Sequence, residues 1–105
     1  MSFTGNENHD ISFTNAAVMT KKYRDNNPGA ILGGFFGKTA LLALLNQSNC
    51  VGISYYYGLD ANGNKVLVLA GCDANENDLT GPTNLCKEMS VLCPPHCGTN
   101  DILNS

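Results

Sequence analysis

Charged residues are scarce in this chain, and their scarcity excludes several large classes of protein. Only 14% of its 105 residues are charged, six of them are Lys or Arg, and the formal net charge is −3. A protein that follows a nucleic-acid backbone needs a dense basic stripe, so we expect no nucleic-acid partner. The longest apolar run, "TALLALL" at 39–45, is far shorter than the ~20 residues of a membrane span, so we expect no membrane partner.

Signals for export and for catalysis are also missing. The first ten residues, "MSFTGNENHD", have neither a basic region nor an apolar stretch, so we expect a cytoplasmic protein with reduced thiols. The five cysteines are an odd number, and a complete set of disulfides within the chain is therefore excluded. The serines lack a G-x-S-x-G context, no carboxylate pair forms an acid–base dyad, and "GGFFGKT" at 33–39 has the wrong spacing for a phosphate loop. The sequence therefore favours a protein without enzymatic activity but leaves an enzyme of an unrecognised type open.

The residues that are present predict one small domain of the α+β class. A helix is predicted over 12–25, with Ser12 as its N-cap and "NNPG" at 26–29 as its stop. A second helix is predicted over 38–48, where four leucines cover more than half of the circumference and indicate nearly complete burial. Between them, "AILGGFFG" at 30–37 is interpreted as a buried connector.

The clearest pattern lies between residues 50 and 72. Two strand-like runs, "CVGISYYYGL" (50–59) and "KVLVLAGC" (65–72), are joined by the turn "DANGN" (60–64), which predicts an antiparallel hairpin. We expect two N-terminal helices packed on a small antiparallel sheet centred on this hairpin, with the C-terminal segment as an edge strand or a coil. The domain is predicted over 11–97, with polar tails at 1–10 and 98–105.

The "CPPHCG" segment at 93–98 has three interpretations, and the sequence leaves all of them open. The spacing of Cys93 and Cys97 suits a zinc or other transition-metal site, with Cys86 and His96 as further candidate ligands. A disulfide or redox pair requires the Pro-Pro pair to fold back, whereas Pro-Pro favours an extended run. In the third interpretation there is no cofactor, the prolines stiffen the chain, and the cysteines pack as small apolar groups.

The sequence D-A-N-x-N occurs twice, at 60–64 and at 73–77. Alternating Asp and Asn residues resemble a calcium-binding loop, but neither copy has the glycine or the final carboxylate that such a loop needs. The first copy is explained by the hairpin turn. The second copy leaves a calcium hypothesis beside an ordinary Asx-rich turn, and its oxygen ligands would be Asp73, Asn75, Asn77 and Asp78.

Five segments together resemble a group of small bacterial proteins that have no assigned function. They are "MTKKYR" (19–24), "FFG" (35–37), "CVGISYYYGLDANG" (50–63), "LVLAGCDANEND" (67–78) and "CPPHC" (93–97). The resemblance covers roughly residues 11–97, and members of the group end in a C-P-P-x-C element. It implies a single stand-alone domain and no particular activity or cofactor. If the variable position of that element is the one filled here by His96, the resemblance argues against a ligand role for this residue.

The leading functional prediction is a non-enzymatic interaction or assembly module that forms homo-oligomers. Strand 65–70 is apolar on both faces, and the chain has few elements to cover them, so we expect a second subunit to do so. The alternative is a metal-binding or thiol-redox protein that uses "CPPHC". The run Tyr55-Tyr56-Tyr57 is expected to have a core or interface role, with Tyr56 on the opposite face from the other two.

Overall fold

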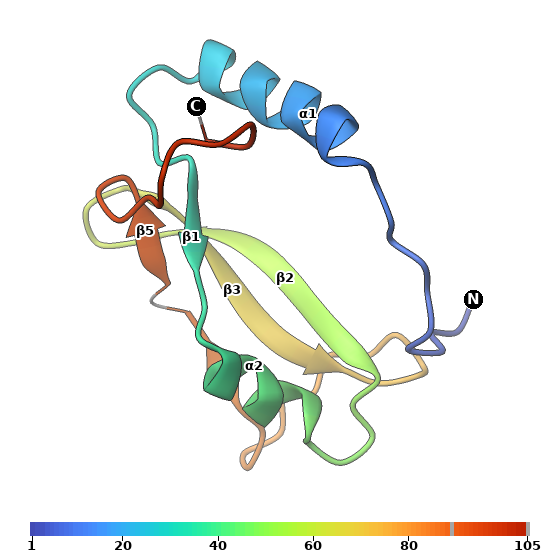
Figure 1. Ribbon diagram of the computed structural model, residues 1–105. Helices are drawn as coiled ribbons and strands as arrows, with labels where there is room; N and C mark the ends of the chain where they lie inside the picture. The colour runs from blue at the N-terminus through green and yellow to red at the C-terminus, as the bar shows by residue number, and fades with distance from the viewer. Residues whose placement is uncertain (89, 105) are drawn as a thin grey trace. The chain divides into compact units, whose positions relative to one another are not determined.

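The computed structural model of the protein describes residues 1–88 and 90–104 (Figure 1). Within these residues it has two helices and five strands, and the strands form two small antiparallel sheets. The chain divides into two compact units. The first unit consists of Met1–Glu7 and Phe36–Ser90, and the second unit consists of Asn8–Phe35 and Val91–Ser105.

The second unit begins with helix α1, Phe13–Asn26. The Ser12 hydroxyl accepts a hydrogen bond from the Asn15 amide at 3.1 Å, which satisfies one of the free N–H groups of the first turn. Gly29 follows the helix with a φ of 77°, a conformation that glycine adopts without strain. The predicted helix and its cap are therefore confirmed.

The two strands of the second unit are far apart in the sequence. Strand β1, Gly33–Phe35, pairs antiparallel with β5, Val91–Cys93, and Gly34 lies opposite Leu92. The centre of the segment predicted to be a buried connector is thus an exposed strand, and Phe35 is 64% exposed. The sequence did not indicate this strand, because its glycines give no alternating pattern and the strand is defined by backbone pairing with β5.

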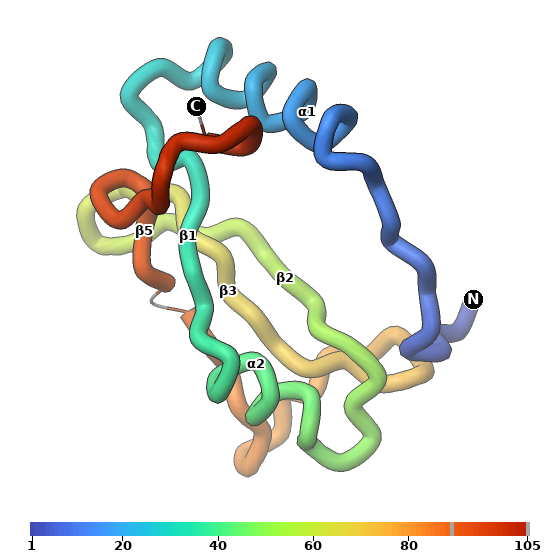
Figure 2. The backbone as a smooth tube through the Cα atoms, viewed as in Figure 1, coloured from blue at the N-terminus to red at the C-terminus, as the bar shows by residue number. Residues whose placement is uncertain are grey.

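The first unit contains the predicted hairpin, and here the prediction is confirmed. Strand β2, Gly52–Leu59, pairs antiparallel with β3, Lys65–Cys72, and β3 pairs on its other side with the short strand β4, Cys86–Lys87. The order of the sheet is therefore β2-β3-β4. The long twisted ribbon of β2 and β3 is clear in the backbone trace (Figure 2). This order leaves β2 at an edge of the sheet.

The core of the first unit forms where helix α2, Lys38–Leu45, contacts β2 and β3. Leu44 is fully buried and Leu69 is 6% exposed. Both faces of β3 are largely covered within the chain, because Val66 and Ala70 on the other face are buried as well. Leu42 and Leu45 are each 42% exposed. The prediction that the second helix is almost entirely buried is therefore wrong.

A glutamine and a glycine hold α2 against the sheet. The Gln47 Oε1 atom accepts hydrogen bonds from the Leu85 amide at 2.8 Å and from Asn84 Nδ2 at 3.3 Å, and its Nε2 donates to the Leu44 carbonyl at 3.0 Å. A Cβ atom at Gly71 would lie 2.8 Å from Gln47 Nε2. Only glycine at this position lets the Gln47 amide approach β3 so closely.

The predicted packing of the fold is wrong, although the α+β composition holds. Two N-terminal helices were expected on one sheet, but α2 alone packs on the three-stranded sheet and α1 belongs to the other unit. The physical reason is the β1–β5 pairing, which takes the chain between the two helices into a separate sheet. The single domain over 11–97 with a tail on either side stays a prediction. In the N-terminal segment, the Phe3 amide donates to the Ala74 carbonyl at 3.0 Å.

Candidate functional site

Strand β2 exposes three consecutive tyrosines. Tyr55 is 59%, Tyr56 is 54% and Tyr57 is 67% exposed, and Leu59 at the end of the strand is 75% exposed. Tyrosine combines a large apolar ring with a hydroxyl that stays hydrated, and such residues are enriched in protein interfaces. We refer to these four residues as the tyrosine surface.

Two of the tyrosines form an ordered aromatic pair on one face. The rings of Tyr55 and Tyr57 lie 5.9 Å apart at 76°, which is an edge-to-face arrangement. The Lys65 ammonium lies over the Tyr57 ring, 4.3 Å from its centroid, in cation–π geometry. The pair is therefore held in place from the β3 side.

Tyr56 is held on the opposite face by a hydrogen bond from its hydroxyl to the Asp78 carboxylate. This bond, and then one with Ser54, lowers the pKa of Asp78. The same hydrogen bond and the negative charge of Asp78 raise the pKa of Tyr56. The phenol therefore stays protonated near neutral pH and is not an activated nucleophile.

The outer edge of β2 has no strand beside it within residues 1–88 and 90–104. In an antiparallel pair, alternate residues direct their N–H and C=O groups toward the partner strand, so half of the eight residues of β2 direct theirs away from β3. The strand sequence, "GISYYYGL", contains no charged residue and no proline. Both are common means of protecting an edge strand from pairing with another chain.

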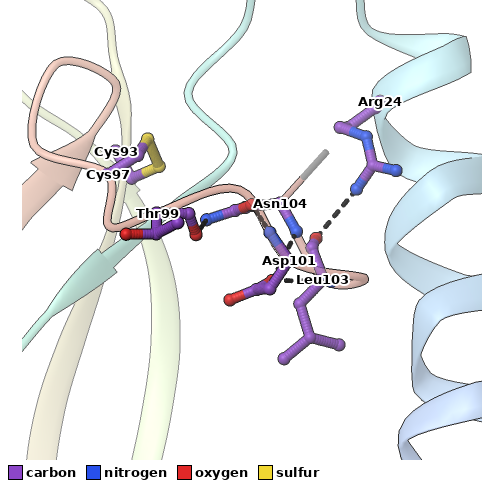
Figure 3. Close-up of a disulfide and its surroundings, with 7 residues drawn as sticks. All are labelled: Arg24, Cys93, Cys97, Thr99, Asp101, Leu103 and Asn104. Carbon is purple, nitrogen blue, oxygen red and sulfur yellow. Dashed lines mark hydrogen bonds between the residues drawn. A yellow bond between two sulfur atoms is a disulfide. The ribbon is translucent and has the colours of Figure 1, made fainter.

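The "CPPHC" segment folds back and closes a disulfide between Cys93 and Cys97, whose Cα atoms lie 4.8 Å apart (Figure 3). The peptide bonds before Pro94 and Pro95 are both cis, so the extended run expected of Pro-Pro is not what forms. Backbone hydrogen bonds fix the start of the loop. The Leu32 amide donates to the Cys93 carbonyl at 2.7 Å, and the His96 amide donates to the Leu92 carbonyl at 3.0 Å.

The segment after the disulfide folds into a small turn that contacts α1 (Figure 3). The Asp101 carboxylate accepts hydrogen bonds from the amides of Leu103 at 2.8 Å and Asn104 at 3.1 Å. Arg24 of α1 donates from its guanidinium to the Leu103 carbonyl at 2.8 Å. The turn and the disulfide loop are thus both part of the second unit.

The four candidate metal ligands have different positions. Cys93 and Cys97 are bonded to each other, His96 is exposed in the same loop, and Cys86 is an exposed free thiol in β4 of the first unit. In the described part of the chain, no group of three or more His, Cys, Asp or Glu side chains could hold a metal ion. A disulfide removes the thiolates that a metal needs, so the metal site stays a prediction that concerns the reduced protein.

The two D-A-N-x-N loops have the same hydrogen-bonding pattern. Asp60 Oδ1 accepts from the amides of Asn62 and Asn64 at 2.9 and 2.8 Å, and Asp73 Oδ1 accepts from those of Asn75 and Asn77 at 2.9 and 3.0 Å. Each aspartate thereby caps its own loop, as in an Asx turn. This favours the turn interpretation over calcium binding for the second loop.

No protein-family model matches the chain, and comparisons with curated proteins and with solved structures find no match either. No helix within residues 1–88 and 90–104 has the length and apolar character required to cross a membrane. Two features of the molecule bear on its function, the tyrosine surface and the Cys93–Cys97 disulfide. The sequence identified both segments and named Asp78 as a candidate calcium ligand, but it did not predict the contact of Asp78 with Tyr56, which forms only through the fold.

Proposed function

We propose that this protein is a non-enzymatic interaction module that assembles with copies of itself through the tyrosine surface. The observation that supports this proposal is a run of three exposed tyrosines on an unprotected edge strand. Isolated exposed apolar residues are ordinary on protein surfaces, but contiguous groups of them mark interaction sites.

The exposed residues that support assembly lie on β2 and not on β3. The sequence pattern predicted an interface on β3, but Leu69 and Val66 are buried within a single chain and need no second subunit. The side chains that remain exposed belong to β2. Because Tyr55 and Tyr57 are already ordered by each other and by Lys65, binding through them loses little conformational freedom.

The test of this proposal is the mass of the protein in solution as a function of concentration, measured by sedimentation equilibrium. We expect a mass above that of one chain that falls on dilution. Truncating Tyr57 (Tyr57→Ala) should weaken assembly by about tenfold, as expected for an interface residue worth more than 1 kcal/mol. Phe13→Ala is the matched control, because Phe13 is 70% exposed on α1 and lies outside the tyrosine surface. The mass of a single chain at every concentration would refute the proposal.

A second candidate function, thiol–disulfide exchange, is favoured by the position of the disulfide. Cys97 is exposed and Cys93 is half-buried, so an incoming thiolate reaches Cys97 more readily. Its attack on the Cys97 sulfur forms a mixed disulfide and releases Cys93 as a thiolate. A second thiol of the reductant then resolves the mixed disulfide, which leaves two protein thiols and an oxidised reductant.

Equilibration in thiol–disulfide buffers, followed by alkylation and mass spectrometry, tests this second function. A pair that exchanges with the glutathione pool supports a redox role, whereas a pair that stays oxidised at the most reducing ratio is structural.

The metal-binding alternative is tested by adding zinc to the reduced protein and measuring its mass by mass spectrometry. A bound zinc ion that is lost in Cys93→Ser would support metal binding, and the absence of any zinc adduct would contradict it.

A cytoplasmic location is part of the proposal, and it has a consequence for the disulfide. Cytosolic thiols are kept reduced, and a cytosolic disulfide is usually transient. Cys93 and Cys97 should then be reduced in most molecules in the cell. Trapping thiols by alkylation at the moment of lysis measures this fraction, and a fully oxidised pair would contradict a cytoplasmic location.

A further inference from the structure

We infer that the assembly forms when β2 pairs antiparallel with β2 of a second copy, edge to edge, and joins the two three-stranded sheets into one. This inference rests on the self-assembly proposed above and specifies its geometry. The occupant of the edge is thus a second copy of this chain.

The backbone of β2 has the groups that a further strand requires. Half of its residues direct N–H and C=O groups away from β3, and no described strand accepts them. The opposite edge of the same sheet is protected, because β4 has only two residues and one of them is Lys87. Short strands and lysines are the usual protection of sheet edges, and β2 has neither.

The side chains of β2 leave this edge accessible. Asp78 pairs with Cys72 on the side of β3 away from β2, so the hydrogen bond to Asp78 directs the Tyr56 hydroxyl toward β3 and leaves the outward backbone groups of β2 uncovered. Lys65 of β3 holds the Tyr57 ring in a similar way. Near the two ends of the strand, Gly52 and Gly58 have no side chain to obstruct a second backbone.

The exposed area is sufficient for a specific interface. Each residue of the tyrosine surface is more than half exposed. At about 100 Å² for each side chain, plus the strand backbone, a pair of copies buries about 1,000 Å², which is the lower limit for a specific complex. We therefore expect a dimer that dissociates on dilution rather than an obligate one.

The symmetry of the pair restricts the register. Residues directly opposite each other in an antiparallel pair point to the same face, whereas successive residues of one strand point to opposite faces. A two-fold axis perpendicular to the sheet therefore lies midway between one residue and the same residue of the second copy. With the axis at Tyr56, Tyr56 faces Tyr56 of the second copy and Tyr55 faces Tyr57 of the second copy. This register places the tyrosines of the two copies side by side on both faces of the joined sheet. It brings no like charges together, because residues 52–59 carry none.

The first test is the double variant Tyr55→Lys/Tyr57→Lys, which places lysines opposite lysines in this register. We expect its sedimentation mass to be that of one chain at concentrations where the wild type is a dimer. Phe13→Lys is the control and should leave the dimer intact, since it places an exposed lysine on α1, outside the tyrosine surface. A wild-type protein that is monomeric at all concentrations refutes self-assembly and this inference together. A wild-type dimer that survives in the β2 variant leaves self-assembly standing and overturns edge pairing.

Hydrogen exchange of the wild-type protein gives a second test that does not depend on the folding of a variant. Edge pairing adds hydrogen bonds to the outward N–H groups of β2, so alternate amides in Gly52–Leu59 should become protected as the concentration rises. Tyrosines that pack only through their rings would leave these amides exchanging at the same rate in monomer and dimer. That result would overturn the inference even if the dimer itself is confirmed.

Discussion

Replacing Glu76 with glycine should stabilise the protein, although it deletes a whole side chain. Glu76 has a φ of 70°, and Gly63 has a φ of 80° at the equivalent position of the other D-A-N-x-N loop. The left-handed conformation costs a residue with a Cβ about 1–2 kcal/mol, and glycine adopts it without that cost. The two loops therefore provide a natural comparison of the same turn with and without a Cβ atom.

The expected gain follows from three terms. Removing the Cβ strain contributes about 1–2 kcal/mol, and the greater freedom of glycine in the unfolded chain offsets about 0.4–1 kcal/mol of it. Glu76 also lies 3.5 Å from the N-terminal ammonium, in a pair whose side chains are 73% and 40% exposed. A surface pair of this kind contributes only a few tenths of a kcal/mol. The net expectation for Glu76→Gly is a stabilisation of about 0.5 kcal/mol.

Urea unfolding measures this difference as a higher midpoint with an unchanged slope. Glu76→Gln is the control for the ion pair, because it removes the charge but keeps the strained backbone, and it should change stability by a few tenths of a kcal/mol at most. Gly63→Ala is the reciprocal variant and should destabilise by about 1 kcal/mol, since a Cβ there meets no atom within 4 Å and only the backbone conformation is affected. A destabilised Glu76→Gly protein would refute the argument that the two loops are equivalent.

Three further predictions concern packing, the disulfide and pH. Gly71→Ala should destabilise the protein in urea unfolding by about 1–3 kcal/mol, because the new Cβ would lie 2.8 Å from Gln47 Nε2, and an unchanged midpoint would contradict this packing. Opening the five-residue Cys93–Cys97 ring by the double Ser substitution should cost about 2 kcal/mol in the same assay by the chain-entropy model, whereas equal stability would mean that the ring does not constrain the unfolded chain. The pKa of Asp60 is lowered in the folded protein, mainly by the hydrogen bond from the Asn64 amide. The ionised carboxylate therefore stabilises the fold fully above the ordinary pKa of Asp, and this stabilisation is lost as the pH falls through the lower pKa of the folded state. Asp60→Asn should therefore reduce the loss of stability below about pH 4 in acid titrations followed by circular dichroism, and an unchanged acid titration would show that the carboxylate has no such role.

The elements of this fold that could be predicted from sequence are those with local signals. Ser12 followed by helix-forming residues predicted α1, and the alternation on either side of "DANGN" predicted the β2–β3 hairpin. The pairing of β1 with β5 could not be predicted, because glycines supply no alternation and the partner strand lies at the other end of the chain. Without that pairing, the assignment of both helices to one sheet was reasonable but wrong.

The candidate sites show the same division. The sequence identified the tyrosine run and the "CPPHC" segment, and it placed Tyr56 on the opposite face from Tyr55 and Tyr57 through the period of a strand. It could not show that Pro94 and Pro95 turn the chain so that Cys93 meets Cys97, since two prolines alone favour an extended run. The partner of Tyr56 was also hidden, because Asp78 approaches it only after the chain has passed along β3 and turned back.

By itself, the sequence determined the local elements: the capped helix, the hairpin and its turn, the apolar strand β3, and the lack of basic and long apolar segments. Each depends on neighbours within a few residues, where backbone preferences and side-chain periodicity act directly. Only the tertiary structure decided which strand became the edge, which faces of β3 were covered, and which cysteines met. These outcomes depend on contacts between segments that are distant in the sequence. The pattern of residues along the chain does not show which backbone groups remain unpaired after folding.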